Sequence, residues 1–94
     1  MSDQTFAVIV RMMWIDGVID EDSEIGREDI RRAFMVSIPQ ASMDLRRYRN
    51  ANPGRIAYDT SLKRYVQIEG SKPLFGGSAR AAAAEIVRQV GEIN

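Results

Sequence analysis

The side chains best suited to chemistry in this chain lie in residues 37–50, and they act by hydrogen bonding and charge. Gln40 carries an amide that can form two hydrogen bonds with adenine, and Arg46 or Arg47 can bind guanine in the same way. Met43 lies between them in sequence and can contact the methyl group of thymine. These residue types in this order favour contact with base edges in the major groove of B-DNA.

Catalysis has little support in the same sequence. The 94 residues include no cysteine and no histidine, so the thiol nucleophile, the commonest general base and the usual zinc ligands are missing. The acidic stretch after Asp16 fails the spacing of a calcium loop, because its first two ligand positions would be Met12 and Trp14. We expect no enzyme activity, no cofactor and no metal.

Charge is distributed unevenly along the chain, although it sums to zero. Residues 1–26 hold one Arg against six Asp or Glu, a net charge of −5. Residues 27–64 hold nine Lys or Arg against four Asp or Glu, a net charge of +5, and residues 65–94 hold three of each sign. A basic middle segment favours an anionic partner, which here would be double-stranded DNA.

Length and hydropathy indicate a single domain over residues 1–94. Hydrophobic residues make up 45% of the chain and charged residues 28%, which is typical of globular proteins. The longest apolar runs, Phe6–Val10 and Met12–Ile15, are too short to span a membrane, and no secretion signal is recognisable. We expect a cytoplasmic protein, associated with the nucleoid through DNA, with no membrane partner.

Helices are expected to position the segment 37–50. A first helix, Thr5 to about Ile15, is apolar at nearly every position, so it needs a second packing partner, either the C-terminal helix or another subunit. We expect Gly17 to end this helix before an acidic connector over residues 16–24. A second helix over Arg27–Met35 follows.

A third helix runs from Pro39 to about Arg49, after a turn over Met35–Ile38. Ser37 or Ile38 caps it, and proline is favourable in the first turn because the amide there has no intrahelical partner. Two helices joined by so short a turn are typical of a helix-turn-helix over about residues 27–49.

The two faces of the third helix differ in kind. Helical spacing places the core stripe at Ile38, Ala41, Leu45 and Tyr48. The opposite face carries Pro39, Gln40, Met43, Arg47 and Asn50, with Arg46 at its edge. Ala41 and Ser42 are small enough to let a neighbouring helix approach closely. Asp44 is unfavourable beside phosphate, so we expect it to be structural, turned toward Arg47 or Arg31.

Two short β-type runs, Ile56–Asp59 and Tyr65–Ile68, predict a hairpin, the wing, over about residues 56–68. Lys63 and Arg64 at its tip, and Arg55 before it, are expected to hold the flanking DNA backbone. A linker over residues 69–78 leads to a last helix over about 78–92, capped by Ser78. The fold class is therefore mainly α with a small β-hairpin: a winged helix-turn-helix of three helices, wing and C-terminal helix.

Two alternatives to sequence-specific regulation remain open. Paired arginines late in an exposed helix also occur as a solvated face that suits the helix dipole. An architectural DNA-binding factor in recombination or plasmid maintenance would use the same surface. A winged helix used only for protein–protein interaction would suit the zero net charge.

Residues 26–66 closely resemble the N-terminal winged helix-turn-helix of WYL-domain transcriptional regulators, particularly those associated with phage-defence loci. The matching residues are Phe34, SIPQASMDL at 37–45, Tyr48, YD at 58–59 and KRYV at 63–66. KPLF at 72–75 resembles the segment that follows the wing. A weaker similarity to sugar-operon repressors covers the third helix.

The resemblance implies a bacterial or phage repressor that binds DNA as a homodimer and regulates a nearby operon. It implies DNA contacts by Ser37, Gln40, Ser42, Met43, Arg46 and Arg47, and by Lys63 and Arg64 on the wing. The outward helix face adds Pro39 to this set. The 94 residues leave no room for a WYL domain, so effector sensing is not expected to carry over. The last helix and the apolar first helix are the expected dimer surface.

Overall fold

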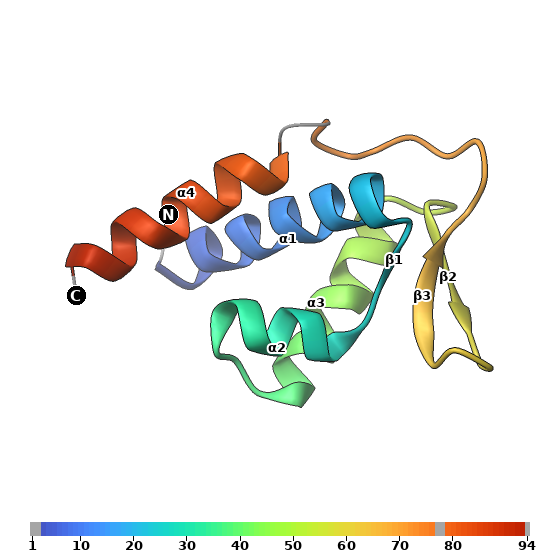
Figure 1. The fold of residues 1–94 in the computed structure, drawn as a ribbon, viewed down its shortest axis with the longest axis horizontal. Coiled ribbons are helices and arrows are strands. Elements are labelled where there is room, and N and C mark those ends of the chain that lie inside the picture. Colours follow the sequence, from blue (N-terminus) through green and yellow to red (C-terminus); the bar gives the residue numbers. More distant parts are fainter. Residues whose placement is uncertain (1–2, 77–78, 94) are drawn as a thin grey trace.

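A computed structural model describes residues 3–76 and 79–93 of the chain. Its elements, in order, are α1 (Asp3–Asp22), β1 (Glu24–Ile25), α2 (Arg27–Phe34), α3 (Ile38–Ala51), β2 (Ile56–Asp59), β3 (Arg64–Gln67) and α4 (Ala79–Ile93). Figure 1 shows α1 and α4 side by side, α2 and α3 packed on the other side of α1, and the hairpin at one end. This mainly helical arrangement with a small sheet is a winged helix-turn-helix, as the sequence predicts.

The first helix is longer than predicted, because it continues through Gly17 to Asp22. Glycine inside a helix costs only about 1 kcal/mol relative to alanine, and here close packing requires it. A Cβ atom on Gly17 would lie 2.2 Å from the Cβ of Arg80 in α4. The prediction that Gly17 ends the helix is wrong, and most of the expected acidic connector is helical. No helix among the described residues is long and apolar enough to span a membrane.

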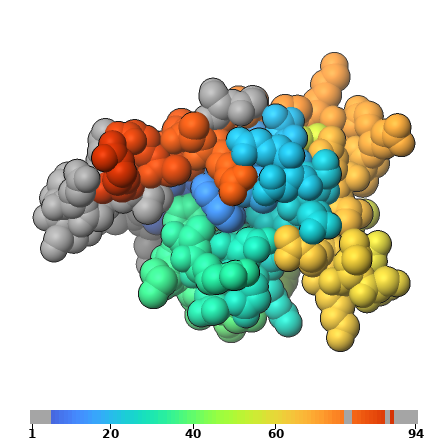
Figure 2. All heavy atoms as spheres, viewed as in Figure 1, coloured from blue at the N-terminus to red at the C-terminus, as the bar shows by residue number. Residues whose placement is uncertain are grey.

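The second partner surface that α1 needs is α4. Arg80 joins the two helices: its guanidinium carbon lies 5.6 Å from the ring centroid of Trp14. The same side chain forms ion pairs with Glu21 at 2.8 Å and Asp22 at 3.4 Å. In Figure 2, α4 (red and orange) covers one side of α1, and the yellow wing projects at the other end of the molecule. The predicted cap of α4, Ser78, lies outside the described residues.

The strands form one antiparallel sheet in the order β1-β3-β2. β1 has only two residues and was not predicted; it pairs with β3 through Glu24 and Val66. β2 has the predicted bounds, whereas β3 begins one residue earlier than predicted, so that Asp59 pairs with Arg64. Because β1 directly precedes α2, the sheet fixes the wing against the start of the helix-turn-helix.

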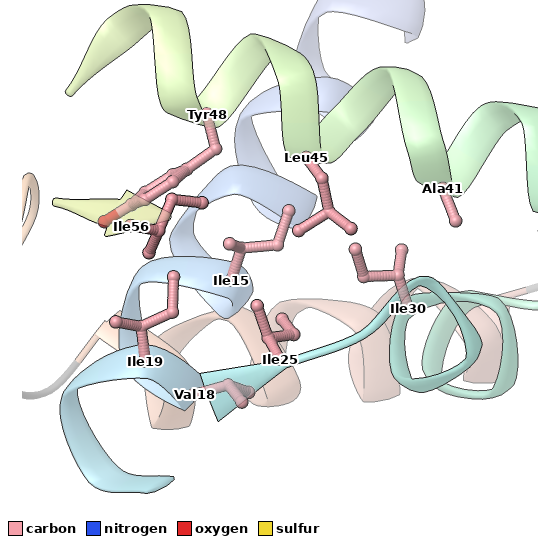
Figure 3. Packing of buried hydrophobic residues seen from close by; sticks show 9 residues of the cluster. All are labelled: Ile15, Val18, Ile19, Ile25, Ile30, Ala41, Leu45, Tyr48 and Ile56. Atoms are coloured by element: carbon pink, nitrogen blue, oxygen red, sulfur yellow. The ribbon is translucent and has the colours of Figure 1, made fainter. Parts of the chain in front are cut away.

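The core joins all of these elements except α4. Figure 3 shows Ala41, Leu45 and Tyr48 of α3 pointing toward side chains of α1, β1 and α2. The buried cluster consists of Ile15, Val18, Ile19, Ile25, Ile30, Ala41, Leu45, Tyr48 and Ile56. Each large aliphatic side chain contributes about 1.5–3 kcal/mol when it leaves water. The predicted core stripe of α3 is confirmed at these three positions, and Ile38 is partly buried.

Candidate nucleic-acid interface

Local sequence fixes where α3 begins. Met35 ends α2 in the left-handed conformation, with φ of 56°, and the turn to α3 is only three residues long. The side chain of Ser37 then caps α3 by accepting a hydrogen bond from the backbone N–H of Gln40 at 3.2 Å. Pro39 occupies the first turn, as expected. The prediction of Ser37 as the cap is confirmed, although α3 starts one residue earlier and ends two residues later than predicted.

The face of α3 turned away from the core is exposed over three turns. Its exposed side chains are Pro39, Met43, Arg46, Arg47 and Asn50. Met43 is 48% exposed although it lies in the middle of a helix. Ser42 and Gln40 are half-buried, and Gln40 is drawn toward a carboxylate beside this face. The side chains predicted to face a partner therefore do share one accessible surface.

The carboxylate of Asp44 is fully buried behind this surface and holds its side chains. It accepts hydrogen bonds from Arg11 Nε at 2.6 Å, Gln40 Nε2 at 3.1 Å and Arg47 Nη1 at 3.4 Å. The predicted pairing with Arg47 is confirmed, whereas Arg31 pairs with Glu28 instead. Two side chains able to contact bases thus share one acceptor, which Arg11 links to α1.

A second buried carboxylate, Asp16, fixes the segment that follows the wing. It accepts hydrogen bonds from the Tyr48 hydroxyl and from the backbone N–H groups of Leu74 at 2.7 Å, Phe75 at 2.8 Å and Gly76 at 3.3 Å. Burial first, and then the hydrogen bond to Asp16, raises the pKa of Tyr48 to about 12. The KPLF segment is therefore tied to both α1 and α3.

Arg55 is not the surface cation that the sequence predicted. Its side chain is 1% exposed. One guanidinium nitrogen donates to the backbone oxygen of Ser71 at 2.9 Å, and the other forms an ion pair with Asp20 at 3.5 Å. The expected contact of Arg55 with DNA is contradicted, because the guanidinium is enclosed and already bound by acceptors from the linker and from α1.

Arg64 lies on the wing as predicted, but its charge is largely neutralised within the fold. It forms ion pairs with Asp29 of α2 at 2.7 Å and with Glu24 of β1 at 3.2 Å. Its neighbour Lys63 is exposed at the tip of the hairpin, with a positive φ of 55°. The two wing cations therefore differ: Arg64 fastens the wing to α2, and Lys63 is turned to solvent.

The cations without carboxylate partners gather around one cavity. Ion pairs within the described residues include Arg11, Arg31, Arg32, Arg47, Arg55, Arg64, Arg80 and Arg88. No described carboxylate forms an ion pair with Arg27, Arg46, Arg49, Lys63 or Lys72. All of these except Lys72 line a cavity of about 430 Å³ between α2, α3 and the hairpin. The sequence had identified Arg46 and Lys63 but missed Arg27 and Arg49.

Hydrogen bonding and electrostatic attraction are the chemistry that this surface offers. Among the described side chains, no group of three or more carboxylates is arranged to hold a metal ion. The amide and guanidinium donors on α3 match the acceptors on base edges, and the unpaired cations match phosphate oxygens.

A short turn between two helices, an accessible polar face on the second of them and a hairpin beside it define a winged helix-turn-helix domain. The chain belongs to the family of BrxR transcriptional regulator winged helix-turn-helix domains, which it matches over residues 7–87. The resemblance to phage-defence regulators, carried in sequence by residues 26–66, is confirmed by this match.

Similar proteins include the DNA-binding transcriptional repressor CapW of Pseudomonas aeruginosa, 33% identical over 69 residues. That alignment covers 73% of this chain and 23% of the relative. CapW of Stenotrophomonas maltophilia is 34% identical over 64 residues, which cover 68% of this chain and 21% of the relative. The chain thus spans less than a quarter of the length of these relatives along the matched region.

Proposed function

We propose that this chain is a DNA-binding domain of a transcriptional repressor, which reads a specific duplex sequence with α3 in the major groove. The accessible face of α3 carries the proposal, because Met43, Arg46 and Arg47 are exposed together on a helix whose other face is core. The major groove, about 12 Å wide, admits such a helix. The CapW relatives, described as DNA-binding transcriptional repressors, support the same role.

Base reading falls to Gln40, Met43 and Arg47, and Arg46 lies at the edge of the same face. The residues at the start of a recognition helix meet base edges, and later residues meet phosphates. Ser37, Pro39 and Ser42 lie in the first turns, close to where the groove wall passes. The wing, through Lys63 and Arg64, rests on the flanking backbone, and such contacts position the domain without reading sequence.

Two copies are proposed to bind two half-sites in the cytoplasm, with the layer of α1 and α4 as their shared surface. Phe6, near the start of α1, remains 45% exposed after α4 has packed, which supports further burial there. A two-fold dimer of this kind places its half-sites about 34–36 Å apart, one helical turn of DNA. Sedimentation of the chain with and without a two-site duplex tests this part of the proposal.

Selection of bound sites from a pool of random duplexes tests the reading function. We expect one motif to be enriched, and Arg47→Ala to weaken binding to that motif by about 1–3 kcal/mol. Arg32→Ala on α2 removes the same charge from a side chain that is 70% exposed, and serves as the control. A pool without any enriched motif would contradict sequence-specific binding, and strong bending of all bound duplexes would favour an architectural role.

A further inference from the structure

We propose that the cavity between α3 and the wing binds one phosphate group of the DNA backbone, with Arg27 and Arg49 as ligands beside Arg46 and Lys63. This inference rests on the proposed function, because it names the part of the duplex that the cavity receives. Neither Arg27 nor Arg49 belongs to the residues that the sequence assigned to DNA.

Charge balance is the first reason for an anionic ligand. Each of the other arginines lies within ion-pair distance of a carboxylate, and three of them, Arg55, Arg64 and Arg80, are paired with the acidic segment 20–24. The carboxylates nearest the cavity, Asp29 and Glu24, are held by Arg64 at 2.7 and 3.2 Å. The fold thus uses its carboxylates elsewhere and leaves four cations around one hollow, where their mutual repulsion favours an incoming anion.

The position of the cavity is the second reason. Its walls are the later turns of α3, the hairpin and the start of α2. When α3 lies in the major groove and the wing rests beside it, one sugar–phosphate strand must pass between them, since one strand separates adjacent grooves. The cavity between α3 and the wing is the place where that strand passes.

The lining identifies a backbone phosphate rather than a free anion. Tyr58 and Tyr65 form an edge-to-face pair in the wall, with ring centroids 5.1 Å apart, and Tyr58 is 48% exposed. A sugar–phosphate segment has an apolar sugar face that can pack on such rings, which inorganic phosphate lacks. The N-terminus of α2 adds a favourable dipole. The N–H of Gly26 already donates to Asp29 at 2.9 Å, so side chains rather than that amide supply the ligands.

Salt dependence of duplex binding provides the test, measured by fluorescence anisotropy with the 94-residue chain and its selected duplex. We expect Arg49→Ala and Arg27→Ala each to flatten the slope of log K against log salt by about 1, without changing the ranking of duplex sequences. Lys72→Ala is the matched control, because Lys72 is exposed and unpaired but lies outside the cavity. Slopes for the two arginine variants equal to the control would overturn the inference.

A neutral methylphosphonate, placed at one backbone position at a time, identifies the phosphate. We expect one position at which this replacement weakens the wild-type chain but does not weaken Arg49→Ala further. Additive losses at every position would overturn the inference. Saturable binding of inorganic phosphate below about 1 mM, detected at Arg27 and Arg49 by NMR, would also overturn it by making a free anion the occupant. A wild-type chain that binds no duplex at all would instead overturn the proposed function.

Discussion

Replacing Asp44 with asparagine removes the charge that holds the reading face of α3 in place. The carboxylate is fully buried, and Arg11, at 2.6 Å, has a side chain only 11% exposed. The variant therefore leaves a nearly buried guanidinium without its counter-ion. It also weakens the hydrogen bonds that Gln40 and Arg47 donate to the same group.

The expected loss of stability follows from that burial. Removing one partner of a buried ion pair costs about 3–5 kcal/mol. We expect about 3 kcal/mol for Asp44→Asn, at the lower end of that range, because the amide oxygen of asparagine still accepts one hydrogen bond. In a domain of this size each kcal/mol lowers Tm by about 4–8 °C, so the variant should melt about 12–24 °C below the wild type.

Thermal unfolding followed by circular dichroism measures this loss, and Glu28→Gln is the control. Glu28 pairs with Arg31 at 2.9 Å, but both side chains are about half exposed, so its loss should cost less than about 1 kcal/mol. A Tm change for Asp44→Asn no larger than that for Glu28→Gln would refute the role of Asp44. Strictly additive losses in Arg11→Met combined with Asp44→Asn would refute the coupling to α1.

Three further outcomes follow from the packing around α1 and α3. Gly17→Ala should separate α4 from α1 and lower the urea midpoint by about 1–3 kcal/mol, because the new Cβ would lie 2.2 Å from Arg80 Cβ. Asp16→Ala should speed amide hydrogen exchange at residues 74–76, whose N–H groups lose their acceptor. Tyr48 has a pKa of about 12 when folded against 10.0 as the model value, so its contribution is complete below pH 10 and is lost as pH rises toward 12. This alkaline loss should approach about 3 kcal/mol and be absent in Tyr48→Phe, as urea midpoints at about pH 9 and about pH 11 would measure.

Each of these expectations has a contrary result. A Gly17→Ala variant as stable as the wild type would mean that α4 can shift without loss. Unchanged exchange at residues 74–76 in Asp16→Ala would mean that other contacts hold the segment. An alkaline loss of the same size in Tyr48→Phe would assign it to a different group.

The helix-turn-helix could be predicted from sequence because its signals are local. Ser37 and Pro39 mark the start of α3 within three residues, and Ala41, Leu45 and Tyr48 recur at helical spacing. Strand β2 also lies where turn residues and β-type residues predict it. Patterns of this kind depend only on near neighbours in the chain, so one sequence is enough to read them.

The side-chain partners could not be predicted because they come from distant segments. Asp44 and Arg11 are 33 residues apart, and Arg55 and Asp20 are 35 apart, so no local pattern indicates which cation is neutralised. The same limit concealed Arg27 and Arg49, whose lack of partners is visible only once the carboxylates are placed. Gly17 was misread for a related reason, since its role depends on the crossing of α4, about sixty residues later in the chain.

Duplex binding measured across salt concentrations tests the central claim most directly. If four cavity cations and Arg47 neutralise phosphates, the slope of log K against log salt should lie near about −4 for each bound copy. Affinity should then fall by about two orders of magnitude between about 50 and 200 mM salt. Equal affinity at both salt concentrations, or no duplex binding at either, would contradict the assignment of this surface to DNA.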